Sequence, residues 1–316
     1  MERFRIYSPE DTILSNLSEI SERHAILFEQ ELAHISELAL EWMNNRPQDE
    51  EALYALGDIE IDAVPLSPSR HLAQSLNALQ GLENLHTVEK NILLSQEIDR
   101  RLSAEGAHHM QMILESAEYQ FLSQNPQILY QKNSYTDAAY LAFAKLFHEP
   151  RAAYTHSYQA ACEDLYNGIG DFCILPLENA TEGRMNGFLR LIDRFSLKII
   201  ATCTVEGSDH SKSTSFALLG RQLIILPDQI KKKPCALEIA CLIDGISPAG
   251  NWIIAAQLCN LSVSKLHTIP DPDAGDVCHA VFSIREDSML SAFLIYLTIT
   301  NPQYSAIGIY PILSAN

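Results

Sequence analysis

Basic residues are scarce in this chain. Its 22 lysines and arginines stand against 40 aspartates and glutamates, which gives a formal net charge of -18 at pH 7. Binding to nucleic-acid phosphates needs a basic surface that displaces counterions, and anionic membranes attract basic segments in the same way. We therefore expect neither a nucleic acid nor a membrane as a partner. For an anionic ligand, the few basic side chains near its site become the informative ones.

Paired cysteines and long apolar runs are missing as well. Seven cysteines are present, but none has Cys-x-x-Cys spacing and most lie within apolar runs, as is typical of reduced, buried thiols. This pattern disfavours a disulfide framework or a zinc site. No stretch has the length of a membrane span, and the first residues, MERFRIYSPEDT, contain no signal-like apolar segment. We expect a cytoplasmic protein that uses no metal or other cofactor.

The first part of the chain, residues 1–124, has a helical pattern. Apolar residues at positions 13, 17, 20, 28, 32, 35, 39 and 42 follow the spacing of one long amphipathic helix. Further helices are predicted at 86–102 and 107–124. Because no strand pattern interrupts them, we expect a helical bundle.

The second part, residues 125–222, alternates strands and helices, which indicates βαβ units and a largely parallel sheet. Strands are predicted at 127–130, 151–155, 171–177, 197–205 and 213–221, with helices at 134–147, 157–169 and 186–195. The last part, residues 223–316, follows the order βαββαβ, which is the ferredoxin-like arrangement. The predicted fold class is thus multidomain, α followed by α/β.

The stretch CILPLENATEG, residues 173–183, ends an apolar strand in a cluster of hydrogen-bonding side chains. One interpretation is structural: Asn179, Thr181 and Glu182 cap the next helix, and Gly183 relieves the turn. The other is functional, because ligands bind beyond the carboxyl ends of strands in open parallel sheets. Asn179 and Thr181 would then offer neutral donors to a carboxylate, and Glu178 a protonatable group. These residues alone leave both interpretations open.

The surrounding run, residues 166–201, resembles the prephenate dehydratase family, whose strand ends in Pro-Ile-Glu-Asn-Ser and a glycine. STSFALLGR (213–221) is similar to that family's Thr-Arg-Phe strand, and YQKNSYTDAA (130–139) to its opening turn. NLSVSKLHTIP (260–270) and IGIYP resemble its regulatory ACT domain. MILESAEYQ (112–120) is similar to the closing helix of chorismate mutase. The order of the three parts resembles the bifunctional chorismate mutase–prephenate dehydratases.

The resemblance implies conversion of prephenate to phenylpyruvate with loss of water and carbon dioxide, without a cofactor. Thr214 would donate or relay the proton to the departing hydroxyl, and Glu178 would tune the protonation of the site. The implied substrate-binding residues are Thr136, Asn179, Thr181, Gly183, Arg184 and Phe216. The implied mutase-like residues are Arg23, Ser116 and Gln120. The implied effector-binding residues are Gly250, His267 and Thr268. The resemblance further implies an aromatic amino acid as effector and a homodimer formed through the ACT-like domain.

Two departures from the family pattern favour an alternative function: the family's second lobe is replaced by the short connection 206–213, and the motif arginine is replaced by Ser215. A third departure weighs against phenylalanine binding, because the ACT turn reads His267-Thr268-Ile269-Pro270, without the family's acid and arginine. A serine does not supply the charge with which arginine holds a carboxylate, although Arg184 or Lys212 could compensate. The alternative is a non-catalytic binding or regulatory protein that senses an aromatic amino acid or prephenate.

Overall fold

A computed structural model describes residues 30, 33, 37, 87–104, 125–181, 183–207, 213–224, 234–243, 248–270, 276–300 and 304–314. These residues form six helices and one sheet of ten strands. The predicted mutase-like residues Arg23, Ser116 and Gln120 lie outside the described part, so the mutase-like bundle stays a prediction.

The strands and helices expected between residues 127 and 310 are all present, with ends shifted by a few residues. The strands are β1 (Gln127–Gln131), β2 (Arg151–Thr155), β3 (Phe172–Asn179), β4 (Gly183–Arg184), β5 (Lys198–Glu206), β6 (Ser213–Gly220), β7 (Cys235–Ile243), β8 (Ser262–Ile269), β9 (Asp276–Ile284) and β10 (Ser305–Ser314). The helices are α4 (Thr87–Ala104), α6 (Ser134–Ala144), α7 (Tyr158–Tyr166), α8 (Asn186–Arg194), α10 (Pro248–Leu258) and α11 (Leu290–Thr300). The two-residue strand β4 was not predicted.

The first half of the sheet is mixed rather than largely parallel. Strand β1 pairs in parallel with β2 and β3, as the βαβ pattern predicts. Strand β6, however, is antiparallel to both β3 and β5, so the prediction was wrong there. The reason is the short connection from Glu206 to Ser213: a parallel crossover needs a dozen residues or more, whereas an antiparallel hairpin needs few.

The second half has the predicted element order, β7-α10-β8-β9-α11-β10. Its strands lie in the spatial order β10-β7-β9-β8, and all neighbours are antiparallel, which is the split-βαβ arrangement. Its role as a regulatory domain stays a prediction.

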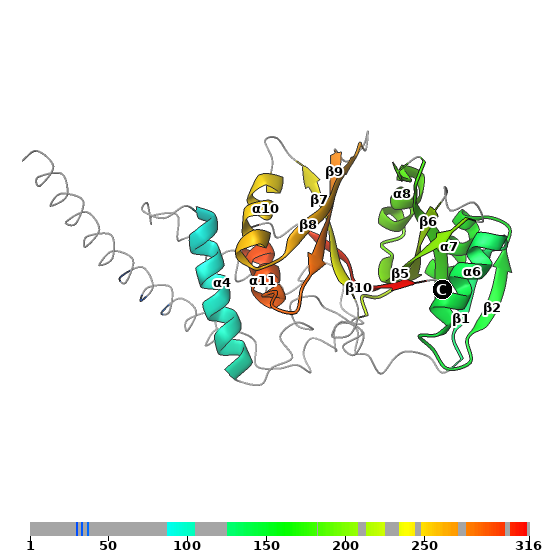
Figure 1. Cartoon of the computed structure of the whole chain (residues 1–316), viewed down its shortest axis with the longest axis horizontal. Coiled ribbons are helices and arrows are strands. Elements are labelled where there is room, and N and C mark those ends of the chain that lie inside the picture. The colour runs from blue at the N-terminus through cyan, green and yellow to red at the C-terminus, as the bar shows by residue number, and fades with distance from the viewer. Residues whose placement is uncertain are drawn as a thin grey trace, which may run out of the picture.

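Strand β10 joins the two halves into one sheet (Figure 1). Its residues 305–311 pair with β7, and residues 312–314 continue in parallel pairing with β5. The sheet order is therefore β2-β1-β3-β6-β5-β10-β7-β9-β8, with β4 attached to β3. The domain boundary predicted at residue 222 is thus spanned by continuous backbone pairing.

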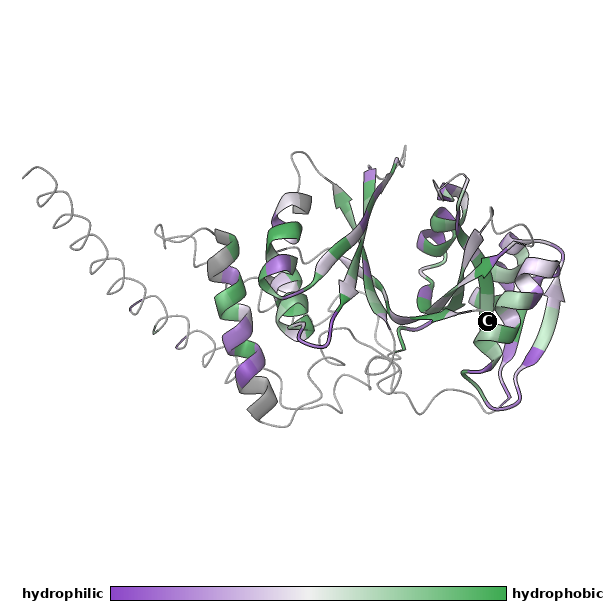
Figure 2. Ribbon diagram, in the orientation of Figure 1, coloured by the Kyte–Doolittle hydropathy of each residue, from purple (hydrophilic) through white to green (hydrophobic). Residues whose placement is uncertain are grey.

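Helix α11 explains why α4 lies where it does. The sequence of α11, LSAFLIYLTIT, is apolar on nearly all sides, and such a helix needs cover on all sides. The sheet covers one side, while α4 packs against α11 and α10 on the other (Figures 1 and 2). Ile92 of α4 joins the core that Trp252, Phe282 and Phe293 form with the sheet. Helix α4, predicted as part of an N-terminal bundle, thus packs onto the C-terminal half.

The seven cysteines are all buried and free, as their spacing predicts. Among the described residues, no helix is both long and apolar enough to cross a membrane.

The strand junction predicts a specific sensitivity at Gly308. A Cβ atom there would lie 2.4 Å from the backbone oxygen of Ile199 on β5. Gly308→Ala should therefore force β10 away from β5 and lower the free energy of unfolding by roughly 1–3 kcal/mol, the usual range for overpacking. Urea denaturation measures this change. Gly250→Ala is the control and should be neutral or slightly stabilising, because a Cβ there would meet no described atom within 4 Å apart from its chain neighbours and its own helix backbone. Equal stability of both variants would contradict the close contact.

Candidate functional site

Alternation along β7 and β9 directs two charged side chains to the side of the sheet that α8 covers. Successive strand residues point to opposite faces. Leu237 and Ile239 face the core beneath α10 and α11, whereas Ala236 and Ala240 face the core that contains α8. Glu238, between Leu237 and Ile239, therefore points toward α8. The same alternation on β9 points His279 that way.

Cross-strand pairing gathers further polar residues on this face. His267 of β8 lies directly opposite His279, and Lys265 lies opposite Val281 two residue pairs further along, on the same face. Tyr310 of β10 lies opposite Ala236, diagonal to Glu238. The pairing thus concentrates titratable side chains on a sheet face whose other members are apolar.

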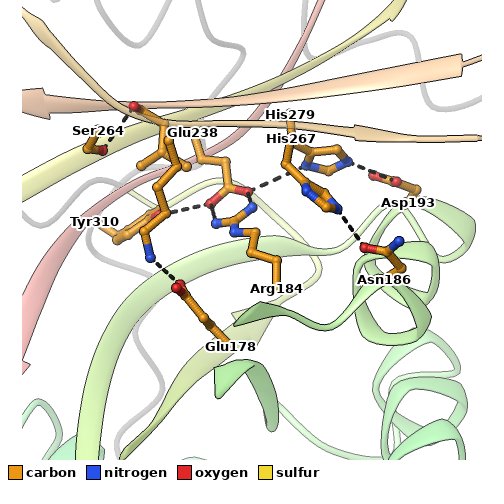
Figure 3. A network of polar contacts seen from close by, with 11 residues as sticks. Glu178, Arg184, Asn186, Asp193, Glu238, Ser264, His267, His279 and Tyr310 are labelled. Carbon is orange, nitrogen blue, oxygen red and sulfur yellow. Dashed lines mark hydrogen bonds and ion pairs between the residues drawn. The ribbon is translucent and has the colours of Figure 1, made fainter. Parts of the chain in front are cut away.

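The facing surface comes from β3, β4 and α8. Gly183 has a φ of 73°, a left-handed conformation that glycine adopts without strain, and it lets the chain turn back so that β4 pairs with the end of β3. Arg184 follows at once, then α8, whose Leu189 and Ile192 are fully buried against the sheet. We call the polar groups enclosed here the junction: Glu178, Arg184, Asn186, Asp193, Glu238, Lys265, His267, His279 and Tyr310 (Figure 3).

The centre of the junction is the ion pair between Arg184 and Glu238. The guanidinium donates from both terminal nitrogens to the two carboxylate oxygens, at 2.6 and 3.0 Å, and the Tyr310 hydroxyl donates to the same carboxylate at 2.9 Å. The side chains are 8% and 0% exposed. Burial alone would raise the pKa of Glu238, but the positively charged His279, 3.4 Å away, and the charge and hydrogen bonds of Arg184 lower it to about 2. The carboxylate is thus ionised and fully engaged.

His279 extends this network to α8. Its Nε2 donates to Asp193 Oδ2 at 3.1 Å, and its Nδ1 lies 3.4 Å from Glu238 Oε1. Burial alone would lower the pKa of His279, but these two carboxylates raise it to about 9. The imidazole is therefore a buried cation at neutral pH.

The outer part of the junction reaches solvent. Lys265 forms an ion pair with Glu178, and their side chains are 46% and 29% exposed. His267 Nε2 donates to Asn186 Oδ1 at 2.5 Å. Burial lowers the pKa of His267, and the positive charges of Arg184 and His279 act in the same direction. His267 is therefore the neutral member of the histidine pair.

Several predicted site residues do come together. Strand pairing places Asn179 opposite Thr214 and Glu178 opposite Ser215, all at least partly exposed. Asn179 Oδ1 accepts from the Thr181 backbone N–H at 2.7 Å, so Asn179 stabilises its own turn. Neither residue caps α8, whose N-cap is Met185 without a side-chain cap hydrogen bond, so the capping prediction was wrong. Ligand binding by this stretch stays a prediction.

Other predicted substrate residues are engaged within the chain. The Thr136 hydroxyl donates to the Gln131 carbonyl at 2.7 Å and accepts from the backbone N–H of Asn133. Asn133 is the N-cap of α6, so this second contact is part of a capping box. Phe216 is 2% exposed within the core. Arg184 holds Glu238 rather than standing open to a ligand. Substrate binding by these three residues stays a prediction.

The predicted effector residues are spread over two places. His267 lies in the junction, next to the exposed Thr268 on the edge strand β8. Gly250 lies in α10, which packs on the other face of that sheet. An effector site that unites all three stays a prediction.

Sequence reasoning missed Glu238, Asp193, Lys265 and His279. The available signal was a lone glutamate in the apolar strand CALEIACLI and a lone histidine in VCHAVFSI. A charged residue in a buried strand needs a partner, but its identity depends on contacts between distant segments. No group of three or more His, Cys, Asp or Glu residues suited to a metal ion occurs in the described part of the chain.

No protein-family model and no curated protein matches this sequence. Similar solved structures include prephenate dehydratases. That of Streptococcus mutans is 16% identical, with a TM-score of 0.49, over 60% of this chain and 99% of that one. That of Arthrobacter aurescens, solved in complex with L-Phe, is 12% identical, with a TM-score of 0.44, over 58% and 90%. The quorum-quenching acylase GqqA is 16% identical, with a TM-score of 0.45, over 58% and 94%. At these identities and TM-scores the likeness by itself assigns no activity to this chain.

The buried pair predicts a pronounced asymmetry between single and double substitutions. Arg184→Met leaves the Glu238 carboxylate buried without its main partner and should lower the free energy of unfolding by roughly 3–5 kcal/mol. The double variant Arg184→Met/Glu238→Leu should regain most of that loss. Urea denaturation measures both, and Lys265→Met, which opens only the exposed pair, should cost at most about 1 kcal/mol. A single variant as stable as the wild type would contradict the assignment.

His279 predicts a stability change on the alkaline side of neutrality. Because its pKa is raised from 6.5 to about 9 in the folded chain, its stabilising contribution is complete below pH 6.5 and is lost as the pH rises through 9. The wild type should therefore lose up to about 1.4 kcal/mol per pH unit more than His279→Gln across this interval. Chemical denaturation at a series of pH values measures the two slopes. Parallel slopes would show that His279 does not carry this proton.

Proposed function

We propose that this chain is a relative of the prephenate dehydratases that binds a small aromatic amino acid or carboxylate and regulates a partner enzyme, without dehydrating prephenate. The observation that carries the proposal is the buried, bidentate pair of Arg184 and Glu238. Arg184 directly follows Gly183 of the predicted site, and freeing it for a substrate carboxylate would leave the buried Glu238 charge without its main partner.

The charge balance of the junction also disfavours a dianionic substrate such as prephenate. Three carboxylates, Glu178, Asp193 and Glu238, face three cations, which are Arg184, Lys265 and the protonated His279. The sum is zero, so two further negative charges would enter without compensation. Transition-state stabilisation by electrostatics needs preorganised donors that are open to the substrate.

The exposed groups at the edge of the junction fit a binding role better. Glu178, Asn179, Thr181 and Lys265 are all at least partly exposed, so a solute can reach them without unfolding the interface. Their mixture of one cation, one carboxylate and neutral hydrogen-bonding groups suits a small polar ligand.

A second candidate function, prephenate dehydration, is favoured by the register of β3 and β6. This pairing sets Asn179 opposite Thr214, so the predicted proton donor and a predicted substrate ligand are neighbours. Aromatisation supplies most of the driving force, so one positioned proton donor could suffice.

Two measurements on the full-length protein separate the candidates. In a thermal-shift series with phenylalanine, tyrosine and prephenate, we expect phenylalanine or tyrosine at 100 times its Kd to raise the Tm by roughly 5–10 °C. In a spectroscopic assay, the protein should not accelerate either reaction. Prephenate should form phenylpyruvate at its spontaneous rate, and chorismate should likewise react at its spontaneous rate.

The opposite outcome supports the dehydratase. The non-catalytic proposal would be overturned if the wild type forms phenylpyruvate enzymatically and Thr214→Ala abolishes this activity. Thr204→Ala, on the adjacent strand, is the control and should leave such an activity intact. An unchanged Tm with every aromatic ligand would overturn the binding role.

A further inference from the structure

The dipeptide Asn-Gly occurs twice in this chain, at Asn167-Gly168 and at Asn186-Gly187. An asparagine followed by glycine loses its side-chain amide in water more readily than one followed by other residues, because glycine places no side chain beside its own backbone nitrogen. Both asparagines are exposed, so water reaches both. The two sites are therefore alike in sequence and exposure, and a difference between them has to come from the fold.

The loss of the amide is an attack by the backbone nitrogen that follows the asparagine on the side-chain amide carbon. This nitrogen gives up its proton to solvent, a succinimide ring closes between it and Cγ, and the side-chain Cγ–N bond breaks, which releases ammonia. Water then opens the ring at either carbonyl and leaves an aspartate or an isoaspartate. The attack is favoured by a backbone N–H that is free to lose its proton and by a donor that stabilises the amide oxygen as it gains negative charge.

At Asn167 the fold holds the attacking nitrogen in place. The Gly168 N–H donates to the Leu165 carbonyl at 3.0 Å, in the turn that ends α7. A Cβ at Gly168 would lie 2.6 Å from Arg221 Nη1, so the guanidinium covers this glycine. Ring closure at Asn167 therefore has to break a hydrogen bond and displace Arg221.

At Asn186 the attacking nitrogen is open. Asn186 is the first residue of α8, and the N-cap residue Met185 supplies no side-chain hydrogen bond. The Gly187 N–H has no backbone acceptor among the described residues, as is usual in the first turn of a helix. A Cβ at Gly187 would meet no described atom within 4 Å apart from its chain neighbours and its own helix backbone. The positive end of the helix dipole lies at this nitrogen and favours the loss of its proton.

The amide oxygen of Asn186 also has a donor. His267 Nε2, on β8 across the junction, donates to Asn186 Oδ1 at 2.5 Å (Figure 3). This hydrogen bond withdraws electron density from the amide carbon, and it stabilises the negative charge that develops on Oδ1 during the attack. The fold thus supplies at Asn186 both of the features that favour ring closure.

We infer that Asn186 is a deamidation site of the folded chain, with the Gly187 nitrogen as nucleophile and His267 as the donor that stabilises the amide oxygen. Water is the only other reactant. The product adds a fourth carboxylate to the junction, whose three carboxylates and three cations otherwise cancel. The inference is independent of the proposed binding function, because it concerns a charge that the chain adds to itself.

The new carboxylate should change the protonation of His267. Burial lowers the pKa of His267, and the positive charges of Arg184 and His279 act in the same direction, whereas Glu238 opposes them. A carboxylate at position 186 gives the imidazole a direct anionic partner, so its pKa should rise. Asn186→Asp reproduces the aspartate product, and an NMR titration should show that His267 takes up its proton at a higher pH in this variant than in the wild type. Identical titration curves would show that the new charge does not meet His267.

Peptide mapping by mass spectrometry tests the site itself. The full-length protein is kept folded in mildly alkaline buffer, and samples taken over time show the conversion of each asparagine. We expect Asn186 to react roughly 10-fold faster than Asn167, because only Gly168 has to give up a hydrogen bond. The same chain in urea is the control: only the local sequence acts there, so both sites should react at similar rates.

Three variants test the assigned roles. Gly187→Ala should remove the advantage of Asn186 over Asn167, because the added methyl group hinders the attacking nitrogen, and alanine is well tolerated in a helix. His267→Leu should slow the reaction at Asn186 roughly 3- to 10-fold through loss of the donor, with Asn167 unchanged. His267→Gln keeps a side-chain N–H and should restore part of the rate. The Tm of each variant shows whether it is folded.

The rates decide the inference without any ligand, so they leave the proposed function untouched. Equal rates at the two sites in the folded chain, or a faster reaction at Asn167, would overturn it. So would conversion of Asn186 in urea alone, because α8 would then protect the amide. A faster reaction in His267→Leu would overturn the role of the histidine, since the hydrogen bond would then restrain the amide.

Discussion

The arrangement of the two halves depends on one desolvated ion pair. Glu238 is fully buried in an apolar strand, and a carboxylate there is tolerated only with a close cation and further hydrogen bonds. Arg184 supplies the cation, Tyr310 a hydroxyl, and His279 a second positive charge. The first partner comes from the other half of the molecule and the other two from neighbouring strands, so the ionised carboxylate requires that both halves be in place.

This requirement couples chain segments that the backbone sheet alone would not hold in one orientation. Among the described residues, 312–314 of β10 pair with β5, which is a short ladder between two large parts. Leu189 and Ile192 share one apolar core with Ala236, Ala240 and Val281 of the C-terminal sheet, which adds non-directional apolar contact. The ion pair, with its fixed bidentate geometry, adds direction, and it thereby sets which groups meet at the solvent-exposed edge of the junction.

The same ion pair changes the functional interpretation of the stretch CILPLENATEG. Glu178, Asn179 and Thr214 do lie together at the strand ends, as the predicted substrate site requires. The wall opposite them, however, is the face of the C-terminal sheet, which brings Lys265 and His267. The charges on this surface balance, which disfavours a dianionic ligand such as prephenate.

The sequence by itself determined the local elements: period-two runs such as CALEIACLI became strands, and the apolar run of α11 became a buried helix, because these patterns act through near neighbours. It also identified the cluster at 178–181, since polar groups at a strand end are visible locally. It did not determine the antiparallel β6, the return of β10 to β5, or the partners of Glu238 and His279. Those depend on which distant segments pack together, and the partners of a buried charge are chosen by three-dimensional proximity, which spacing along the chain does not encode.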